Sequence, residues 1–462
     1  MEAVRICCAG LDVHQETVVA CILKGPLEQK PQSLIQTFGT TTKELLKLQD
    51  WLHQQECKEV VMESTGVLWK PVWNILEASC QLVLANARRV KNMPGRKTDT
   101  KDAQWLAQLH RCGLIEASMV PEQDIRDLRD LTRYRTKMVQ AVTSEKNRIH
   151  KILQDANIKL TTYISDLYGV SGRALLQKLM SGEVLEESEV RSLVKTQLKK
   201  KVPQLLDALN GKLRRHHREM MDEHWEHLLY LEQKIARLEE KIEACVEEYQ
   251  EVVERIDSIP GIERTSAITI FAEIGPHVAE MFPTDAQFAS WAGLCPGNNE
   301  SAGKRKKAKT MQGNKHLKAA LCQVAWANHR SNNRIGQFFR RIRKRRGDKK
   351  ANVATGHLLI RILHTMLREQ TNYKEIDVPL GEGTSSKKKW MFTWRISDRW
   401  DTTFSYVQSL LNSISLFSKV KTIFQVVGLF LSKINQTTFK AGFNFRIKSY
   451  KITAIVSRVS RY

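Results

Sequence analysis

The chain has 462 residues, of which 73 are Lys or Arg and 50 are Asp or Glu, so its formal net charge is +23. This length allows two or three domains with buried cores. The charge favours a polyanionic partner, either a nucleic acid or an anionic membrane surface. The longest apolar run, residues 426–431, falls far short of the roughly 20 residues of a membrane span, so we expect no membrane partner.

The cysteines and the first residues indicate a location. Nine Cys occur without a Cys-x-x-Cys pair and without the usual zinc spacing, which indicates buried thiols in a reducing compartment. Residues 6–13 follow the acidic Glu2 and are typical of a strand rather than of a signal peptide. We therefore expect a cytoplasmic protein that is associated with the nucleoid.

Residues 1–124 alternate predicted strands and helices. Apolar runs predict five strands, at residues 4–13, 17–23, 32–38, 59–63 and 81–85. Helical spacing predicts helices at residues 42–55 and 68–78 and a further helix that begins at Asp99. Three strands followed by alternating helices and parallel strands predict an α/β domain.

Residues 125–255 are predicted to contain long helices. Apolar residues keep a rough heptad over residues 125–160. Further on, two apolar series repeat every seven residues: Leu228, Ile235, Ile242, Tyr249 and Ile256, and Leu231, Leu238, Cys245, Val252 and Ile259. This pattern predicts a coiled-coil seam. Pairing with the helix at 125–160 and self-association into a homo-oligomer are equally consistent with it.

Residues 256–375 predict a mainly helical domain with a basic surface. Pro260-Gly261 joins two predicted helices as in a helix-hairpin-helix, although an ordinary helix connection fits equally well. Residues 304–350 carry many basic residues and one acidic residue, Asp348, which favours a nucleic-acid surface over a solvated helix face. We expect nucleic-acid contacts from Lys304, Arg305, Lys306, Lys307, Lys315 and Lys318.

Two features near this surface have plainer interpretations. Trp326, Phe338 and Phe339 lie among the basic residues at a spacing typical of core side chains rather than of base-stacking side chains. Residues 376–462 are a polar linker and a basic tail, and residues 402–462 contain no Asp or Glu. The tail fits a strand-rich appendage and read-through past an older end equally well.

Four acidic residues lie where predicted elements end or begin. Asp12 and Glu63 end strands, while Asp99 and Asp102 open a helix with a spacing that places both on one face. Proteins hold Mg²⁺ with a few carboxylates together with phosphate oxygens. Two such ions can clamp the attacking and leaving oxygens of a phosphoryl displacement. In so basic a chain, the four residues predict Mg²⁺-dependent chemistry on a nucleic acid.

Each carboxylate also has a structural explanation. Asp12 fits a strand-end turn before His14, and Glu63 fits a solvent-facing strand end. Asp99 and Asp102 fit an N-cap and an acidic N3 residue. Any one of these explanations taken alone outweighs catalysis. Taken together, the order and placement of the four residues match the layout of RNase H-like nucleases.

Longer stretches make a resemblance specific. The sequences GLDVHQ, VVMESTG, GRKTDTKDA, IPGIERTSAITIFAEIG, FASWAGLCPGNNESAGKRK and QGNKHLK occur in this order. They resemble the DEDD insertion-sequence transposases of the IS110 family, which are bridge-RNA-guided recombinases. The resemblance covers most of residues 6–368 and leaves the tail uncovered. It implies a RuvC-like N-terminal domain, a coiled-coil connection and a C-terminal transposase domain.

The resemblance also implies site residues and partners. At the matching positions, the carboxylates that would bind Mg²⁺ are Asp12, Glu63, Asp99 and Asp102. The family's serine nucleophile matches Ser301, where Ala302 departs from the family's Ser-Gly-Gly pattern. Double-stranded DNA and a guide RNA would be the partners, and strand exchange would pass through a phosphoserine intermediate.

Two other functions are consistent with the residues. A RuvC-like endonuclease or Holliday-junction resolvase needs the carboxylates but no serine nucleophile. An inactive nucleic-acid-binding remnant needs neither. The presence of all four carboxylates and of Ser301 favours the recombinase, with Ser64, Ser266 and Ser290 as weaker nucleophile candidates.

Overall fold

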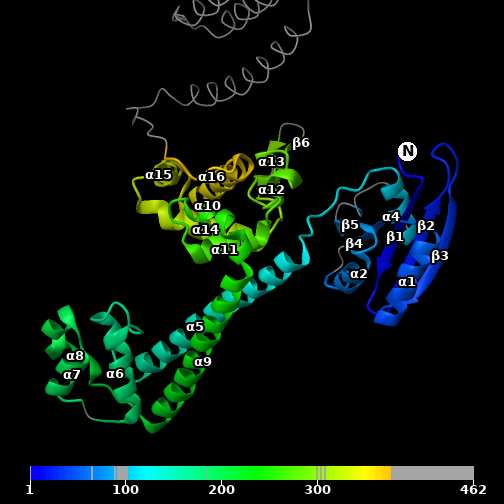
Figure 1. Ribbon diagram of the computed structural model, residues 1–462. Helices are drawn as coiled ribbons and strands as arrows, with labels where there is room; N and C mark the ends of the chain where they lie inside the picture. The colour runs from blue at the N-terminus through cyan, green and yellow to red at the C-terminus, as the bar shows by residue number, and fades with distance from the viewer. Residues whose placement is uncertain are drawn as a thin grey trace, which may run out of the picture. The chain divides into compact units, whose positions relative to one another are not determined.

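A computed structural model describes residues 2–63, 66–87, 90, 102–183, 185–297, 300–301, 304–305 and 309–375 (Figure 1). Of residues 300, 301, 304 and 305 it describes the backbone. The described residues belong to one compact unit. The predictions made for Ser64, Asp99, Lys306, Lys307 and the tail therefore lie outside the described residues.

The N-terminal part is a five-stranded sheet with the order β3-β2-β1-β4-β5 (Figure 1). Its strands are β1 (Cys7–Val13), β2 (Thr17–Lys24), β3 (Gln32–Gly39), β4 (Glu59–Glu63) and β5 (Gln81–Ala85). The first three strands pair antiparallel, and β1, β4 and β5 pair parallel. All five predicted strands are confirmed, and this mixed α/β arrangement is compatible with an RNase H-like fold.

The first strand begins three residues later than predicted. The backbone N–H groups of Val4 and Arg5 donate to the carbonyl of Arg111 instead of to a neighbouring strand. Arg111 is itself buried, and its guanidinium donates to the carbonyls of Gly25 and Pro26 at 3.1 and 2.7 Å. The N-terminal residues are therefore held at the end of a helix and not in the sheet.

Helices cover both faces of the sheet because successive strand residues point to opposite sides. On one face, α1 (Thr42–Gln54) and α2 (Trp69–Leu76) pack through Leu48 and Leu76 against Leu11 and Met62. On the other face, α4 (Asp102–Arg111) packs against alternate residues of the same strands. The active-site prediction depends on this second face.

Two long helices follow, α5 (Gln123–Asp155) and α9 (Arg215–Cys245). They run antiparallel along each other, because Arg135 pairs with Glu239 and Glu145 pairs with His227 (Figure 1). The seam residues Leu228, Leu231, Leu238 and Ile242 of α9 are buried within the chain. Intramolecular pairing therefore accounts for these seam positions.

The predicted seam does not continue as one helix to residue 259. The helix ends at Val246, and the chain passes through the 3-10 turn η4 (Glu247–Tyr249) into α10 (Gln250–Asp257). Cys245 is exposed, whereas Ile256 and Ile259 belong to the C-terminal core, which Ile242 also joins. The heptad pattern extends past the break because both helices are amphipathic.

Between the long helices lies a small helical core. Its elements are η2 (Leu160–Thr162), α6 (Val170–Ser181), α7 (Glu187–Leu193), η3 (Thr196–Lys201) and α8 (Val202–Leu209). They pack with Leu153 of α5 and Trp225 of α9. The segment between the two long helices is thus mostly helical.

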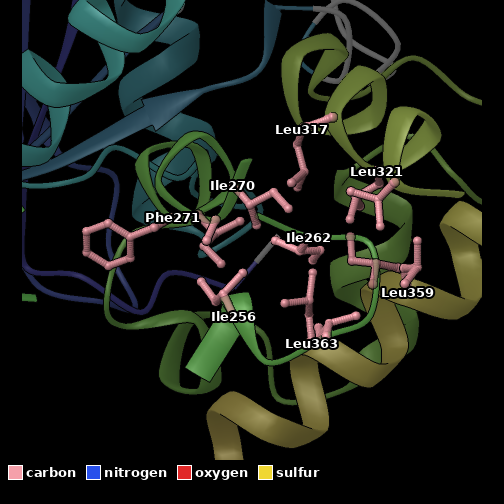
Figure 2. Close-up of a cluster of buried hydrophobic side chains, with 14 of the residues drawn as sticks. Ile256, Ile262, Ile270, Phe271, Leu317, Leu321, Leu359 and Leu363 are labelled. Carbon is pink, nitrogen blue, oxygen red and sulfur yellow. The ribbon is translucent and has the colours of Figure 1, made fainter. Parts of the chain in front are cut away.

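The C-terminal part is mainly helical, as predicted. After α10 it contains α11 (Arg264–Ile274), α12 (Val278–Met281), α13 (Asp285–Trp291), β6 (Glu300–Ser301), β7 (Lys304–Arg305), α14 (Lys315–Ala327), η5 (Asn328–Arg330), α15 (Arg334–Arg346) and α16 (Asp348–Glu369). Figure 2 shows its core, where α10, α11, α14 and α16 meet at Ile256, Ile262, Ile270, Phe271, Leu317, Leu321, Leu359 and Leu363.

Three groups of core residues thus stabilise the described chain: those of the sheet, of the helical middle and of the C-terminal helices. The long helices contribute to two of them, since Ile125 and Leu128 of α5 and Ile242 of α9 belong to the C-terminal core. The domain boundaries at residues 124/125 and 255/256 stay predictions. None of the helices in the described ranges is long and apolar enough to cross a membrane.

Candidate active site

Parallel pairing brings Asp12 and Glu63 together. The register between β1 and β4 pairs Gly10 with Val61 and Leu11 with Met62. Continuing it by one residue places Asp12 beside Glu63, at the carboxyl ends of adjacent strands. Strand neighbours lie about 4.8 Å apart and point to the same face of a sheet. This register is consistent with the sequence prediction that the two carboxylates lie at one site.

Gly10 brings Asp102 to the same face. A Cβ atom on Gly10 would overlap the carbonyl oxygen of Ala103 and the backbone nitrogen of Ala107, so α4 lies directly on the β1 backbone. Asp12 follows Gly10 by two residues and therefore points to the same face. Asp102 is the first residue of α4 and precedes Ala103. The close contact thus directs the start of the helix toward the end of the strand.

The electrostatics of Asp12 agree with this placement. Its side chain is 21% exposed, and its Oδ2 lies 3.1 Å from Nε2 of His14. Burial raises the pKa of Asp12, the neighbouring His14 lowers it, and the charge of Asp102 raises it, with a net increase above the usual value. His14 therefore pairs with Asp12 in addition to standing at the strand end, where the sequence predicted a turn residue.

The donor set fits a hard divalent cation. Burial is the main cause of the raised pKa of Asp12, and a cation between Asp12 and Asp102 would relieve the repulsion that adds to it. Carboxylate oxygens are the ligands that Mg²⁺ prefers. Within the described ranges, which do not include Asp99, no three His, Cys, Asp or Glu side chains form a group close enough to hold a metal ion. The described carboxylates alone therefore do not form a metal site, and their role as ligands stays a prediction.

The serine motif lies in a short hairpin. Ser301 in β6 pairs antiparallel with Lys304 in β7, and Glu300 pairs with Arg305. A bridge between Pro296 and Thr310 closes the loop below the hairpin. The loop's tip therefore carries the predicted nucleophile together with two of the predicted basic residues.

The base of this loop is fixed by Lys318 and by a glycine contact. The Lys318 ammonium donates to the carbonyl of Gly293 at 3.0 Å and to Oγ1 of Thr310 at 2.7 Å. A Cβ atom on Gly313 would overlap the backbone nitrogen of Gly293. Lys318 thus closes the loop, while Lys315 at the start of α14 is exposed. Their contacts with a nucleic acid stay predictions.

Sequence reasoning missed a buried carboxylate beneath this loop. Glu273 is 1% exposed, and its two oxygens accept from Nε and Nη2 of Arg133 at 2.7 Å each. Oε2 also accepts from Nδ2 of Asn314 at 2.7 Å, and Asn314 caps the N-terminus of α14. Arg129 donates to the carbonyls of Ala272 and Glu273. One acidic residue within the apolar stretch AITIFAEI was the available signal.

The Pro-Gly turn joins two packed helices, as predicted. Gly261 has a φ of 81°, and the Nδ2 atom of Asn328 donates to the carbonyl of Pro260 at 2.6 Å. Asn328 is buried and belongs to η5. This bond fixes the turn from inside the core, and binding of phosphate by its backbone stays a prediction.

One prediction about the basic surface is wrong. Phe339 is buried, as predicted, but Trp326 is 47% exposed and is not a core residue. The last turn of α14 carries Trp326 to the edge of the core, because α15 covers the helix through Phe339 and leaves about half of the indole exposed. Phe338 lies between these extremes, with the guanidinium of Arg341 5.2 Å from its ring centre.

Two families of known proteins match parts of the chain. Residues 9–158 match a family described as transposase, of the DEDD type of IS110, and residues 253–340 match the transposase IS116/IS110/IS902 family. The chain contains two IS110-family transposase domains. Asp12, Glu63 and Asp102 lie in the first transposase domain, and Ser301 lies in the second.

A curated relative matches part of the chain. It is a Sinorhizobium fredii protein, y4qE, whose name describes it as a transposase, and it is 23% identical over 248 residues. The match covers 52% of this chain and 50% of the relative, so the chain spans about half the length of that protein.

Proposed function

We propose that the protein is a DNA transposase that cuts and rejoins strands through a serine–phosphate link. The observations that support the proposal are the β1–β4 register, which runs toward Asp12 and Glu63, and the contact of Gly10 with α4, whose first residue Asp102 raises the pKa of Asp12 in addition to burial. The matches to transposase families support the reaction class.

The acidic residues would hold the cation that the reaction requires. Asp12, Glu63 and Asp102 supply carboxylate oxygens at the strand and helix ends, and Asp99 is proposed as the fourth ligand by its place in the motif. Mg²⁺ held there would neutralise charge on the scissile phosphate and lower the pKa of an attacking hydroxyl. His14, whose Nε2 lies 3.1 Å from Oδ2 of Asp12, opposes the rise in the pKa of that carboxyl that burial and the charge of Asp102 cause.

Ser301 is the proposed nucleophile. Its Oγ forms a bond to phosphorus while the bond from phosphorus to one sugar oxygen breaks. The serine proton passes to water, and the leaving sugar oxygen takes up a proton. Lys304 and Arg305 follow Ser301 in the hairpin and are proposed to balance the phosphate charge. The energy of the broken phosphoester bond is retained in the serine–phosphate bond, so rejoining needs no ATP.

The proposed partners are double-stranded DNA and a guide RNA. The net charge of +23 and the basic residues of the second transposase domain support a nucleic-acid partner. Guidance by RNA rests on the resemblance to bridge-RNA-guided recombinases. Pairing of the carboxylate site of one copy with the serine of another copy would require a homo-oligomer, and we include a homo-oligomer in the proposal. We also propose that the protein associates with the nucleoid.

A covalent-capture assay tests the proposal. Purified full-length protein, Mg²⁺, RNA transcribed from the DNA flanking its gene and labelled target DNA are combined and then denatured. We expect label to migrate with the wild-type protein and to be lost in Ser301→Ala and in Asp102→Ala. Ser290→Ala is the matched control, since this serine lies on α13 outside the hairpin, and it should trap label normally.

The fate of the DNA separates the alternatives. Cleavage without trapped label, unchanged in Ser301→Ala, would replace the proposal with a RuvC-like endonuclease. Absence of cleavage and of trapping in every variant would leave a nucleic-acid-binding remnant.

A further inference from the structure

A hollow lies where α14, η5 and α15 meet, outside the carboxylate site and the serine hairpin. Its volume is about 560 Å³, and it is lined by Trp326, His329, Arg330, Asn332, Arg340 and Arg343. Every side chain of the lining is aromatic, amide or basic, and three are arginines. The proposed reaction assigns no role to these residues.

Trp326 gives the hollow a rigid aromatic surface. Its ring stacks on His329, with centroids 4.8 Å apart and an interplanar angle of 16°. Phe339, which is fully buried, meets the same ring edge-on at 5.9 Å. The indole is therefore fixed by two neighbours and still about half exposed. An exposed aromatic ring that is already immobilised loses little conformational entropy on binding a planar group.

The arginines have different roles around this ring. The Nη1 atom of Arg340 donates to the carbonyls of His329 and Ser331 at 3.3 and 2.6 Å, which fixes the corner between η5 and α15. Arg343 pairs with Asp348 at 2.5 Å, and Arg330 is exposed at the edge. Positive charge thus surrounds an aromatic surface without covering it.

We propose that this hollow binds an unpaired nucleobase, stacked on Trp326, with its phosphate near Arg330. An aromatic ring beside guanidinium groups is the chemistry with which proteins bind single-stranded nucleic acid. A base within a duplex is stacked on its neighbours and cannot reach the ring, so the occupant is a single strand or an opened one. The proposal rests on the proposed function in taking a nucleic acid as the partner.

Binding of short labelled oligonucleotides to the full-length protein tests the role of the base. The probes are an oligouridine, the corresponding oligothymidine and an abasic strand of equal length. We expect Trp326→Ala to weaken binding of one or both base-containing strands by about 5- to 150-fold, the usual range for loss of one stacked base. Trp326→Phe should retain binding within about 3-fold, because a phenyl ring also stacks.

One further variant is a control, and another tests the phosphate contact. Tyr230→Ala removes another exposed ring that stacks on a histidine, His227, but lies on α9 outside the hollow, and it should bind normally. Arg330→Gln should reduce the salt dependence of binding, because one phosphate contact is lost. The oligouridine and oligothymidine arms determine whether the natural occupant is RNA or opened DNA.

Photo-cross-linking of the unmutated protein avoids any folding defect of the variants. An oligouridine carrying a photoreactive uracil is irradiated with the protein, which is then digested with trypsin. We expect the nucleotide on the peptide 319–330, which trypsin releases by cleavage after Lys318 and after Arg330. This peptide contains both Trp326 and His329.

Two results would overturn the subsite. One is equal binding of the abasic strand and of the base-containing strands, with no effect of Trp326→Ala, which would reduce the hollow to a phosphate-binding surface. The other is cross-linking confined to other peptides. Either result leaves the covalent-capture result intact, and failure of covalent capture leaves the base-binding result intact, so the two proposals fail separately.

Discussion

At the scale of single residues, Gly10 decides where the acidic residues meet. Without a side chain at this position, the backbone of α4 rests on the backbone of β1 at Ala103 and Ala107. Any Cβ atom would have to displace the helix, and Asp102 at the start of that helix would move with it. Gly10, two residues before the proposed metal ligand Asp12, is thus part of the proposed site although it carries no functional group.

We predict that Gly10→Ala removes covalent capture and lowers the free energy of unfolding by about 1–3 kcal/mol, the usual cost of overpacking. Urea denaturation and the capture assay measure the two effects. Gly39→Ala is the matched control. The nearest atom to its new Cβ, at 3.1 Å, belongs to the flexible side chain of Glu44, which can move aside. Full capture by Gly10→Ala would show that the contact with α4 is not needed for the reaction.

At the scale of elements, Glu273 connects three helices. It lies on α11, its arginine partners lie on α5, and its asparagine partner caps α14. Burial alone would raise the pKa of Glu273. The hydrogen bonds from Arg133 and Asn314 and the charges of Arg133 and Arg129 lower the pKa by more than burial raises it, so it lies below the ordinary 4.5. The loop that carries Ser301 ends at this cap.

We predict that Glu273→Gln lowers the free energy of unfolding by about 3 kcal/mol, because the partly buried Arg129 and Arg133 lose their buried counter-charge. The same change at Glu243, which is 45% exposed and pairs with Arg264, should cost at most about 1 kcal/mol. Urea denaturation of both variants and of the wild type measures the difference.

The pH dependence of this difference follows from the lowered pKa. The folded state binds the proton of Glu273 more weakly than the unfolded state, so its stabilisation is complete above pH 4.5 and is lost as the pH falls through the lower folded-state pKa. The difference between wild type and Glu273→Gln should therefore be constant near neutral pH and shrink below pH 4.5. A difference that grows on acidification would contradict the assigned charge state.

At the scale of the whole molecule, α16 completes the C-terminal core. Its residues Leu359, Ile360 and Leu363 are fully buried among α10, α11 and α14. Each such side chain contributes about 1.5–3 kcal/mol by burial, and a domain's net stability is only about 5–15 kcal/mol. The second transposase match ends at residue 340, before this helix begins.

We therefore predict that a chain of residues 1–375 unfolds cooperatively, at the same temperature as the full chain and with the same covalent capture. A chain of residues 1–347, which lacks α16 but contains both matched domains, should lose the cooperative transition of the C-terminal core. Calorimetry and the capture assay compare the two. Cooperative unfolding of the shorter chain would show that α16 is dispensable.

The sequence by itself determined the type and order of the elements in the sheet domain and the basic character of the C-terminal part. Alternation along the strands and helical spacing are local properties, so the five strands and their helices could be predicted within a few residues. The ends of those strands also located Asp12 and Glu63. Asp99 lies outside the described residues, so its part in the site stays a prediction.

Only the tertiary structure decided which surfaces meet. The heptad repeats could not distinguish pairing within the chain from self-association, because an apolar stripe does not specify its partner, and they did not indicate the break at Val246. Nor could spacing show that Trp326 is exposed or that Glu273 is buried between arginines from another helix. Burial of a side chain depends on residues far away in the sequence, which local patterns do not contain.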